Sequence, residues 1–161
     1  MSYGCDLTAS GHETTSGLLS FLIYCLVTHP TAMIKARDEI TSVLGSGVIT
    51  PDSISKLPYI SAIIRETLRL YPTAPGFTVH PKPNDPKDYP MYIGKEQYII
   101  RKGESVSVSL PAVHRDPTVY GDDAETFRPE RMLDAEFNKL PKNAWKVSSL
   151  TSIDVRYLTS Y

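Results

Sequence analysis

Hydrophobic residues recur at helical spacing in three runs through the first half of the chain. Residues 14–27 are apolar nearly all round, which predicts a helix enclosed on most of its sides. Pro30 suits the first turn of a second helix, whose pattern stops at Gly45. Pro58 begins a third helical pattern, which Pro72 ends. The stripes that define these last two helices are Met33, Ala36, Ile40, Val43 and Leu44, and then Ile60, Ile63, Ile64, Thr67 and Tyr71.

The second half of the chain predicts extended structure. Six prolines between positions 72 and 90 exclude regular helix and predict an extended, turning segment. Residues 105–110 then alternate between serine and an aliphatic side chain, which predicts a half-buried strand. Residues 98–100 are its expected hairpin partner, across a turn at Gly103. The patterns together predict a mainly α chain with a small antiparallel β region.

Composition narrows the class of protein. The 161 residues are 41% hydrophobic and 22% charged, as in one ordinary soluble domain, and the net charge of −1 provides no strong field for nucleic acid or anionic lipid. The apolar run at residues 17–27 would extend about sixteen ångström as a helix, half of a bilayer core, so no membrane span is expected. No basic and apolar leader is evident, which indicates a cytoplasmic location. Cys5 and Cys25 form neither a disulfide framework nor a zinc site.

Glu66 and Arg69 are three residues apart and therefore share one face of the third helix. Considered alone, they predict a solvent-exposed ion pair worth a few tenths of a kcal/mol. The later run at residues 127–131 contains a second arginine that could reach the same carboxylate. The alternative is therefore a buried Arg–Glu–Arg cluster, which costs desolvation but fixes geometry.

The sequence Ser-Gly-His-Glu-Thr-Thr at residues 10–15 also combines groups capable of chemistry. A helical His-Glu-x-x-His zinc site is excluded, because position 16 is Ser16. Two interpretations remain open. The motif could start a helix, with hydroxyls and a carboxylate near the positive end of the helix dipole. It could instead distort a helix locally, so that a threonine hydroxyl faces a ligand and the adjacent carboxylate relays protons.

Taken in order, these motifs resemble the C-terminal half of a cytochrome P450 monooxygenase. Residues 10–15 resemble the family's oxygen-binding motif, with Ser10 where alanine is usual. Glu66-Thr67-Leu68-Arg69 matches the Glu-x-x-Arg motif, and residues 129–132 match Pro-Glu-Arg-Phe with Met132 in the last place. Residues 71–77 and 114–123 are in addition similar to the self-sufficient, reductase-fused fatty-acid hydroxylases of bacteria and fungi.

The resemblance implies haem b as the cofactor and a role for each motif. Thr14, with Glu13, would handle protons while oxygen is activated beside the haem, and Gly11 would leave room for the oxygen. The carboxylate and the two guanidinium groups of the other motifs would form a structural triad beneath the haem, from Glu66, Arg69 and Arg131. His80 lies where many relatives place a haem-propionate partner, although a loop histidine of no special role fits equally well.

The resemblance also implies a substrate and a partner. Ala74, Pro75 and Gly76 would line the substrate pocket, where small residues let an alkyl chain approach. The family inserts one oxygen atom from O2 into a lipophilic substrate such as a fatty acid. Electrons come from NADPH through the FAD and FMN of a reductase, which is either separate or fused. No nucleic-acid partner is expected.

The resemblance covers residues 11–146, whereas residues 1–9 and 147–161 do not resemble the family. In the family, an aromatic-x-x-Gly-x-x-x-x-Cys-x-Gly segment that supplies the axial thiolate should follow soon after Trp145. Residues 147–161 contain neither glycine nor cysteine, so the haem-thiolate loop and the last helix are expected to be absent. The chain is therefore expected to be a partial cytochrome P450 domain, inactive by itself. The alternative is a non-catalytic product that misfolds or modulates a full-length relative.

Overall fold

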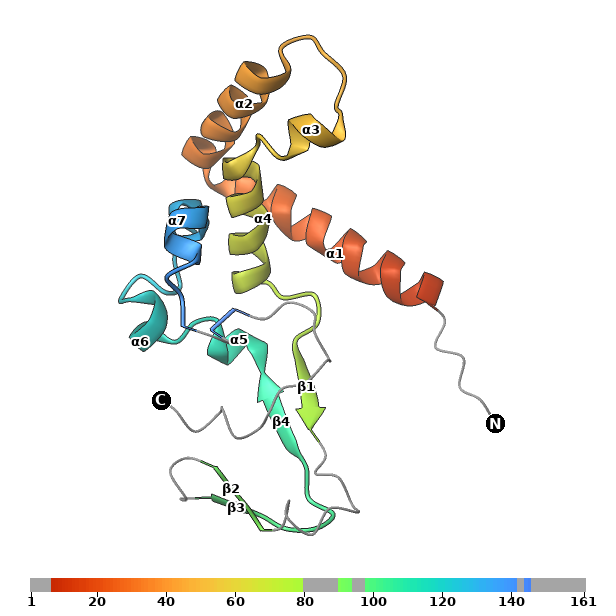
Figure 1. Cartoon of the computed structure of the whole chain (residues 1–161), viewed down its shortest axis with the longest axis vertical. Coiled ribbons are helices and arrows are strands. Elements are labelled where there is room, and N and C mark those ends of the chain that lie inside the picture. The colour runs from red at the N-terminus through yellow and green to blue at the C-terminus, as the bar shows by residue number, and fades with distance from the viewer. Residues whose placement is uncertain (1–6, 80–89, 94–97, 142–143, 146–161) are drawn as a thin grey trace. The chain divides into compact units, whose positions relative to one another are not determined.

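The computed structural model describes residues 7–79, 90–93, 98–141 and 144–145 (Figure 1). The chain divides into two compact units. The first contains the described residues up to Thr73 and from Pro111 onward, and the second contains those from Ala74 to Leu110. The described structure is mainly helical with two small antiparallel sheets, which confirms the predicted fold class.

The first unit is built on helices whose ends are set by proline and glycine. The elements are α1 (Leu7–Thr28), α2 (Pro30–Leu44), α3 (Pro51–Ile54) and α4 (Pro58–Leu70). The predicted starts at Pro30 and Pro58 are confirmed, and α2 ends at Gly45, whose φ of 53° favours glycine. Thr50 and Ser53 form a reciprocal capping box at the start of α3.

A carboxylate from α2 completes the start of α4. Leu57, the residue before the first turn of α4, provides no side-chain cap. Instead, Glu39 of α2 accepts hydrogen bonds from the backbone N–H groups of Tyr59 at 2.8 Å and Ile60 at 2.9 Å. These N–H groups have no partner inside the helix, so Glu39 acts as a cap supplied by a neighbouring helix.

The hydrophobic core of the first unit lies where α1, α2 and α4 meet, and its buried members are Cys25, Ala32, Ala36, Ile63, Leu70 and Phe127. The prediction that α1 is enclosed on most sides is wrong. Leu19, Ile23 and Val27, which recur at four-residue steps, remain 54%, 60% and 63% exposed. The reason is that α1 packs through one face on α2 and α4, and no described element covers the opposite face.

Four short elements complete the first unit, and Figure 1 shows α5, α6 and α7 among them after the strands. They are α5 (Leu110–Val113, whose first residue belongs to the second unit), α6 (Pro117–Tyr120), the 3₁₀ helix η2 (Pro129–Met132) and α7 (Asp134–Phe137). Residues 121–128 connect α6 to η2 without regular structure. A second buried cluster joins them to α4 through Ala62, Tyr120, Ala124 and Met132.

The second unit contains two antiparallel strand pairs. Strand β1 (Gly76–Val79) pairs with β4 (Val106–Ser109), and β2 (Met91–Ile93) pairs with β3 (Tyr98–Ile100). The half-buried alternation predicted for β4 is confirmed, but its predicted partner is wrong, because β3 pairs with β2. Residues 98–100 are favoured as the partner because they are near β4 in the sequence. In the structure β4 pairs instead with β1, which lies in the proline-rich segment. At Gly76 a Cβ atom would lie 2.4 Å from the carbonyl oxygen of Val108, so this close pairing requires glycine.

Within the described residues, no single helix is long and apolar enough to cross a membrane. Residues 12–28 of α1 taken together with α2 satisfy the criteria of length and composition as a pair, but the chain bends by 109° between them.

Candidate functional site

Glu66 and Arg69 lie one turn apart on α4, and both side chains are completely buried. Arg69 donates Nε to Glu66 Oε2 and Nη2 to Glu66 Oε1, each at 2.8 Å, so the pair is bidentate. The prediction of a solvent-exposed ion pair, made from the helix spacing alone, is therefore wrong. The buried alternative is the one found.

A second arginine reaches the same carboxylate from η2. Arg131 donates Nε to Glu66 Oε1 at 3.1 Å, and the backbone N–H of Arg128 donates to that oxygen at 2.9 Å. The side chain of Arg131 is only 7% exposed. The structure thus brings the three predicted triad residues into contact, and Glu66 accepts four N–H donors in all.

The remaining donors of both arginines bind backbone carbonyl groups of the region between α5 and η2. Arg69 donates to the carbonyls of His114 at 2.8 Å, Ala124 at 2.5 Å and Thr126 at 3.2 Å. Arg131 donates to those of Tyr120 at 2.9 Å and Asp123 at 3.0 Å. Irregular backbone lacks the carbonyl partners that a helix or sheet supplies, so the guanidinium groups replace them. We call Glu66, Arg69, Arg131 and these five carbonyls the brace.

Asp123 extends the brace toward solvent. Its carboxylate pairs with Arg131 Nη2 at 2.9 Å and with Arg128 Nη1 at 3.2 Å. Desolvation acts to raise the pKa of Asp123, but the hydrogen bond and charge of Arg131 and the charge of Arg128 outweigh it, so its pKa lies below the usual value. Arg131 therefore contacts two carboxylates, one buried and one partly exposed.

His114 is completely buried and gives its carbonyl to Arg69. Desolvation by burial lowers the pKa of its imidazole, and the charges of Arg69 and Arg115 act in the same direction. The neutral form is therefore the one that the folded chain favours.

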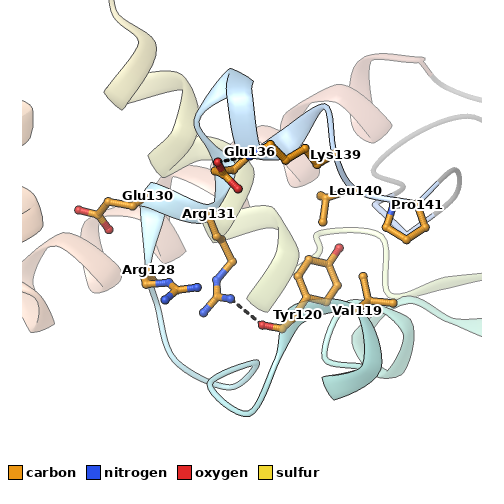
Figure 2. Close-up of a pocket in the computed structure, with 9 residues that line it drawn as sticks. All are labelled: Val119, Tyr120, Arg128, Glu130, Arg131, Glu136, Lys139, Leu140 and Pro141. Atoms are coloured by element: carbon orange, nitrogen blue, oxygen red, sulfur yellow. Dashed lines mark hydrogen bonds and ion pairs between the residues drawn. The ribbon is translucent and has the colours of Figure 1, made fainter.

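A cavity of about 460 Å³ lies beside Arg131 (Figure 2). Figure 2 shows Arg131 directed at the backbone of Tyr120, with the apolar side chains of Val119, Leu140 and Pro141 on the far side of the Tyr120 ring. The basic groups of its lining already have carboxylate partners: Arg128 with Asp123, Arg131 with Glu66, and Lys139 with Glu136.

The other predicted site residues are placed as follows. Glu13 and Thr14 are exposed on α1, and Gly11 lies in the same helix. Because α1 begins at Leu7, the interpretation of residues 10–15 as a helix start is wrong. Ala74, Pro75 and Gly76 are exposed residues at the beginning of the second unit, and His80 lies outside the described residues. The catalytic, cofactor-binding and substrate-binding roles of these residues stay predictions.

The described residues could hold the backbone near a haem, through the brace, but they provide no ligand suited to its iron. Cys25, the cysteine among them, is 1% exposed within the α1–α2–α4 core, and desolvation by burial raises the pKa of its thiol. A buried thiol with a raised pKa is a poor source of a thiolate ligand. In the described part of the chain, no group of three or more His, Cys, Asp or Glu residues could hold a metal ion.

Comparison with known proteins matches residues 4–146 to the cytochrome P450 family. The chain belongs to the cytochrome P450 family. It is 51% identical over 137 residues to a bifunctional cytochrome P450/NADPH–P450 reductase of Aspergillus oryzae, and 50% identical over 137 residues to a self-sufficient cytochrome P450 monooxygenase of Oidiodendron maius. A bifunctional cytochrome P450/NADPH–P450 reductase of Acremonium egyptiacum is also 50% identical over 137 residues.

In each case the match covers 85% of this chain, and 12%, 12% and 13% of the three relatives in turn. The predicted family, including its resemblance to reductase-fused members, is therefore confirmed. The P450 family uses haem, and relatives of this chain carry their NADPH–P450 reductase in the same polypeptide.

Sequence reasoning missed Glu39, Asp123 and the carbonyl partners of the two arginines. Glu39 has no sequence signal, because a carboxylate twenty residues before the N–H that it caps follows no periodicity. Asp123 belongs to an Asp-rich turn that resembles many surface turns. The carbonyl partners are backbone groups, so no residue type marks them.

Proposed function

We propose that this chain is part of the haem domain of an NADPH-dependent, reductase-linked monooxygenase that inserts one oxygen atom of O2 into a fatty-acid-like substrate. The brace carries this proposal, because two arginines sharing one fully buried carboxylate are costly unless they define a geometry that function needs. The names of the relatives, bifunctional P450/reductase and self-sufficient monooxygenase, support the fused arrangement. A cytoplasmic location is part of the same proposal.

Haem, when bound in the complete domain, supplies the oxygen chemistry. The residues of this chain would hold the protein around it. Glu66, Arg69 and Arg131 would fix the irregular segment between α6 and η2 to α4, through the contacts described above. Glu13 and Thr14, the polar pair of α1, are proposed to handle protons. Residues 74–76 are proposed to line the path of an alkyl chain.

A chimera tests this function. Residues 11–146 would replace the matching segment of the Aspergillus oryzae relative, which is 51% identical over 137 residues. We expect NADPH-dependent hydroxylation of dodecanoic acid, followed by mass spectrometry of the product. The matched control carries Glu66→Gln in the same chimera and should lose the carbon monoxide absorbance band of thiolate-ligated haem. A folded chimera that binds haem but oxidises no fatty acid of any chain length would contradict the substrate class.

The 161-residue chain by itself is proposed to form no thiolate-ligated haem, because its described cysteine is buried in the core. The purified chain would be mixed with haemin, reduced and exposed to carbon monoxide. We expect no thiolate-type absorbance band, and the Cys25→Ser variant should give the same spectrum as the parent chain. A thiolate-type band that Cys25→Ser removes would contradict both the spectral expectation and the assignment of Cys25 to the core.

The exposed face of α1 favours a second candidate, a non-catalytic chain that pairs with a full-length relative or aggregates. Leu19, Ile23 and Val27 form an exposed aliphatic stripe, and such a surface promotes association. Co-expression with a tagged full-length relative should recover this chain in the purified complex. Replacing the three residues by serine should abolish the recovery, whereas equal recovery of the triple variant would refute this candidate.

A further inference from the structure

The glutamate that precedes Arg131 in η2 belongs to a second cluster. Glu130 Oε1 accepts from Lys35 Nζ of α2 at 2.6 Å and from the hydroxyl of Tyr59 in α4 at 3.1 Å. Lys35 Nζ also lies 5.8 Å from the centre of the Tyr59 ring. One oxygen atom of η2 therefore connects α2, α4 and η2, outside the brace.

The spacing of the two attachment points on α4 is informative. Tyr59 and Glu66 are seven residues apart, which on an α-helix is roughly two turns, about 10 Å along the axis and on nearly the same face. Consecutive side chains of a 3₁₀ helix diverge by about 120°, since it has 3.0 residues per turn. Figure 2 shows Glu130 and Arg131 leaving η2 in different directions. The two neighbours therefore attach η2 to α4 at two separate heights.

We propose that Glu130 is a positioning residue that fixes the orientation of η2 on α4 and so holds Arg131 in its contact with Glu66. Two contacts already attach η2 to α4 at one height, Arg131 on Glu66 and the Met132 carbonyl on Arg65 Nη1 at 3.1 Å. A further attachment two turns away resists pivoting of the short helix about that height. Lys35 and Tyr59 provide this further attachment from two different helices. Glu130 itself does not contact Glu66, so its effect on the buried pair is transmitted through the backbone of η2.

Other groups near this cluster support its geometry. Desolvation acts to raise the pKa of Glu130, but hydrogen bonds from Lys35, its own backbone and Tyr59 outweigh it and lower the pKa. Glu39 caps the first turn of α4 through the N–H of Tyr59, so the residue that contacts Glu130 is itself fixed. The inference depends only on contacts within this chain and not on haem binding. It can therefore fail while the proposed function stands, and the proposed function can fail while the inference stands.

Hydrogen exchange on the full 161-residue chain, read by mass spectrometry, tests the positioning role. The perturbations are Glu130→Ala, Tyr59→Phe and Arg131→Lys, the last of which keeps the charge but loses the Nε donor to Glu66. We expect Glu130→Ala to speed exchange of η2 amides, such as that of Arg131, by about fivefold. Glu130→Gln keeps an acceptor for Tyr59 and should restore part of the protection.

Coupling to the buried pair separates positioning from a merely local contact. If Glu130 holds Arg131 in place, Glu130→Ala already weakens the Arg131–Glu66 contact. Arg131→Lys should speed hydrogen exchange near Glu66 by some factor in the parent chain. In the Glu130→Ala variant the same substitution should speed it by a factor at least about threefold smaller. The matched control is Glu136→Ala, which removes another exposed glutamate–lysine pair of 2.6 Å, and its effect should multiply with that of Arg131→Lys.

Two results would overturn the inference. One is that the effects of Glu130→Ala and Arg131→Lys multiply as those of the control do. The other is that the parent chain shows no protected amides in α4, because the attachment would then not exist. The mild variants Tyr59→Phe and Glu130→Gln provide the same comparison where Glu130→Ala leaves too little protection to measure.

Discussion

Glu66→Gln is the substitution that most directly probes the brace, because it keeps the shape of the side chain and removes its charge. Glu66 accepts from Arg69 through both oxygens and from Arg131 and the Arg128 backbone through Oε1. In glutamine the amide oxygen can retain the three Oε1 contacts. Its NH2 group then faces Arg69 Nε, where two donors meet.

The magnitude follows from burial. Removing one partner of a buried ion pair costs about 3–5 kcal/mol, since the remaining charge stays out of water. Arg69 is fully buried, and its other contacts are neutral carbonyls, so it has no substitute anion. We therefore expect Glu66→Gln to lower the free energy of unfolding by about 4 kcal/mol. With a urea m-value of about 2 kcal/mol/M, the unfolding midpoint should fall by about 2 M.

The assay is urea unfolding followed by the fluorescence of Trp145, the one tryptophan of the sequence. Trp145 donates Nε1 to the carbonyl of Arg65 on α4 and packs edge-on against Phe137 at 5.1 Å, so its emission reports the packing beside α4. Glu125→Gln, which removes a 76% exposed carboxylate from a pair with Arg115, should change the free energy by less than about 1 kcal/mol. Equal midpoints for Glu66→Gln and Glu125→Gln would refute the reasoning.

Two further predictions concern α4 and its neighbours. Glu39→Ala should cost about 1–2 kcal/mol and selectively speed hydrogen exchange at Tyr59 and Ile60, because their N–H groups lose their acceptor; uniform loss of protection along α4 would contradict a capping role. Burial lowers the pKa of His114 below its ordinary 6.5. Between that value and the lowered pKa, the unfolded chain therefore binds more protons than the folded chain. The free energy of unfolding should fall as the pH decreases through this range. Urea midpoints measured between pH 7.5 and 5.5 should show this slope, and His114→Gln should flatten it; an unchanged slope would assign it to other groups.

The helical part of the fold was predictable from local signals. Pro30, Gly45 and Pro58 act on the backbone within one or two residues, so the ends of α2 and the start of α4 needed no tertiary information. The partner of β3 was not predictable in this way. Both candidate partners of residues 98–100 are short segments with aliphatic side chains, and which one pairs depends on β4 pairing with β1 of the proline-rich segment.

The burial of the site was beyond local reasoning for a similar reason. Nothing within α4 distinguishes a buried Glu66–Arg69 pair from an exposed one, since the spacing is the same. The difference is made by five backbone carbonyl groups. Three of them accept from Arg69 and lie at least 45 residues after it. The other two accept from Arg131 and lie 11 and 8 residues before it. Family resemblance supplied that information, because it identified Arg131 as the third member before any contact was known.

The donors of Arg69 set an order of events for folding. A guanidinium has five N–H donors, and those of Arg69 bind Glu66 within α4 and three carbonyls that lie 45 to 57 residues later in the chain. The irregular segment at residues 121–128 has only turn-type backbone hydrogen bonds of its own, from Ala124 to Gly121 and from Thr126 to Asp123, so its path also depends on α4 presenting this side chain. Closing so long a loop is slow compared with forming a helix. Substitutions at Ala124 or Thr126 should therefore act mainly on the rate of unfolding and hardly on the rate of folding.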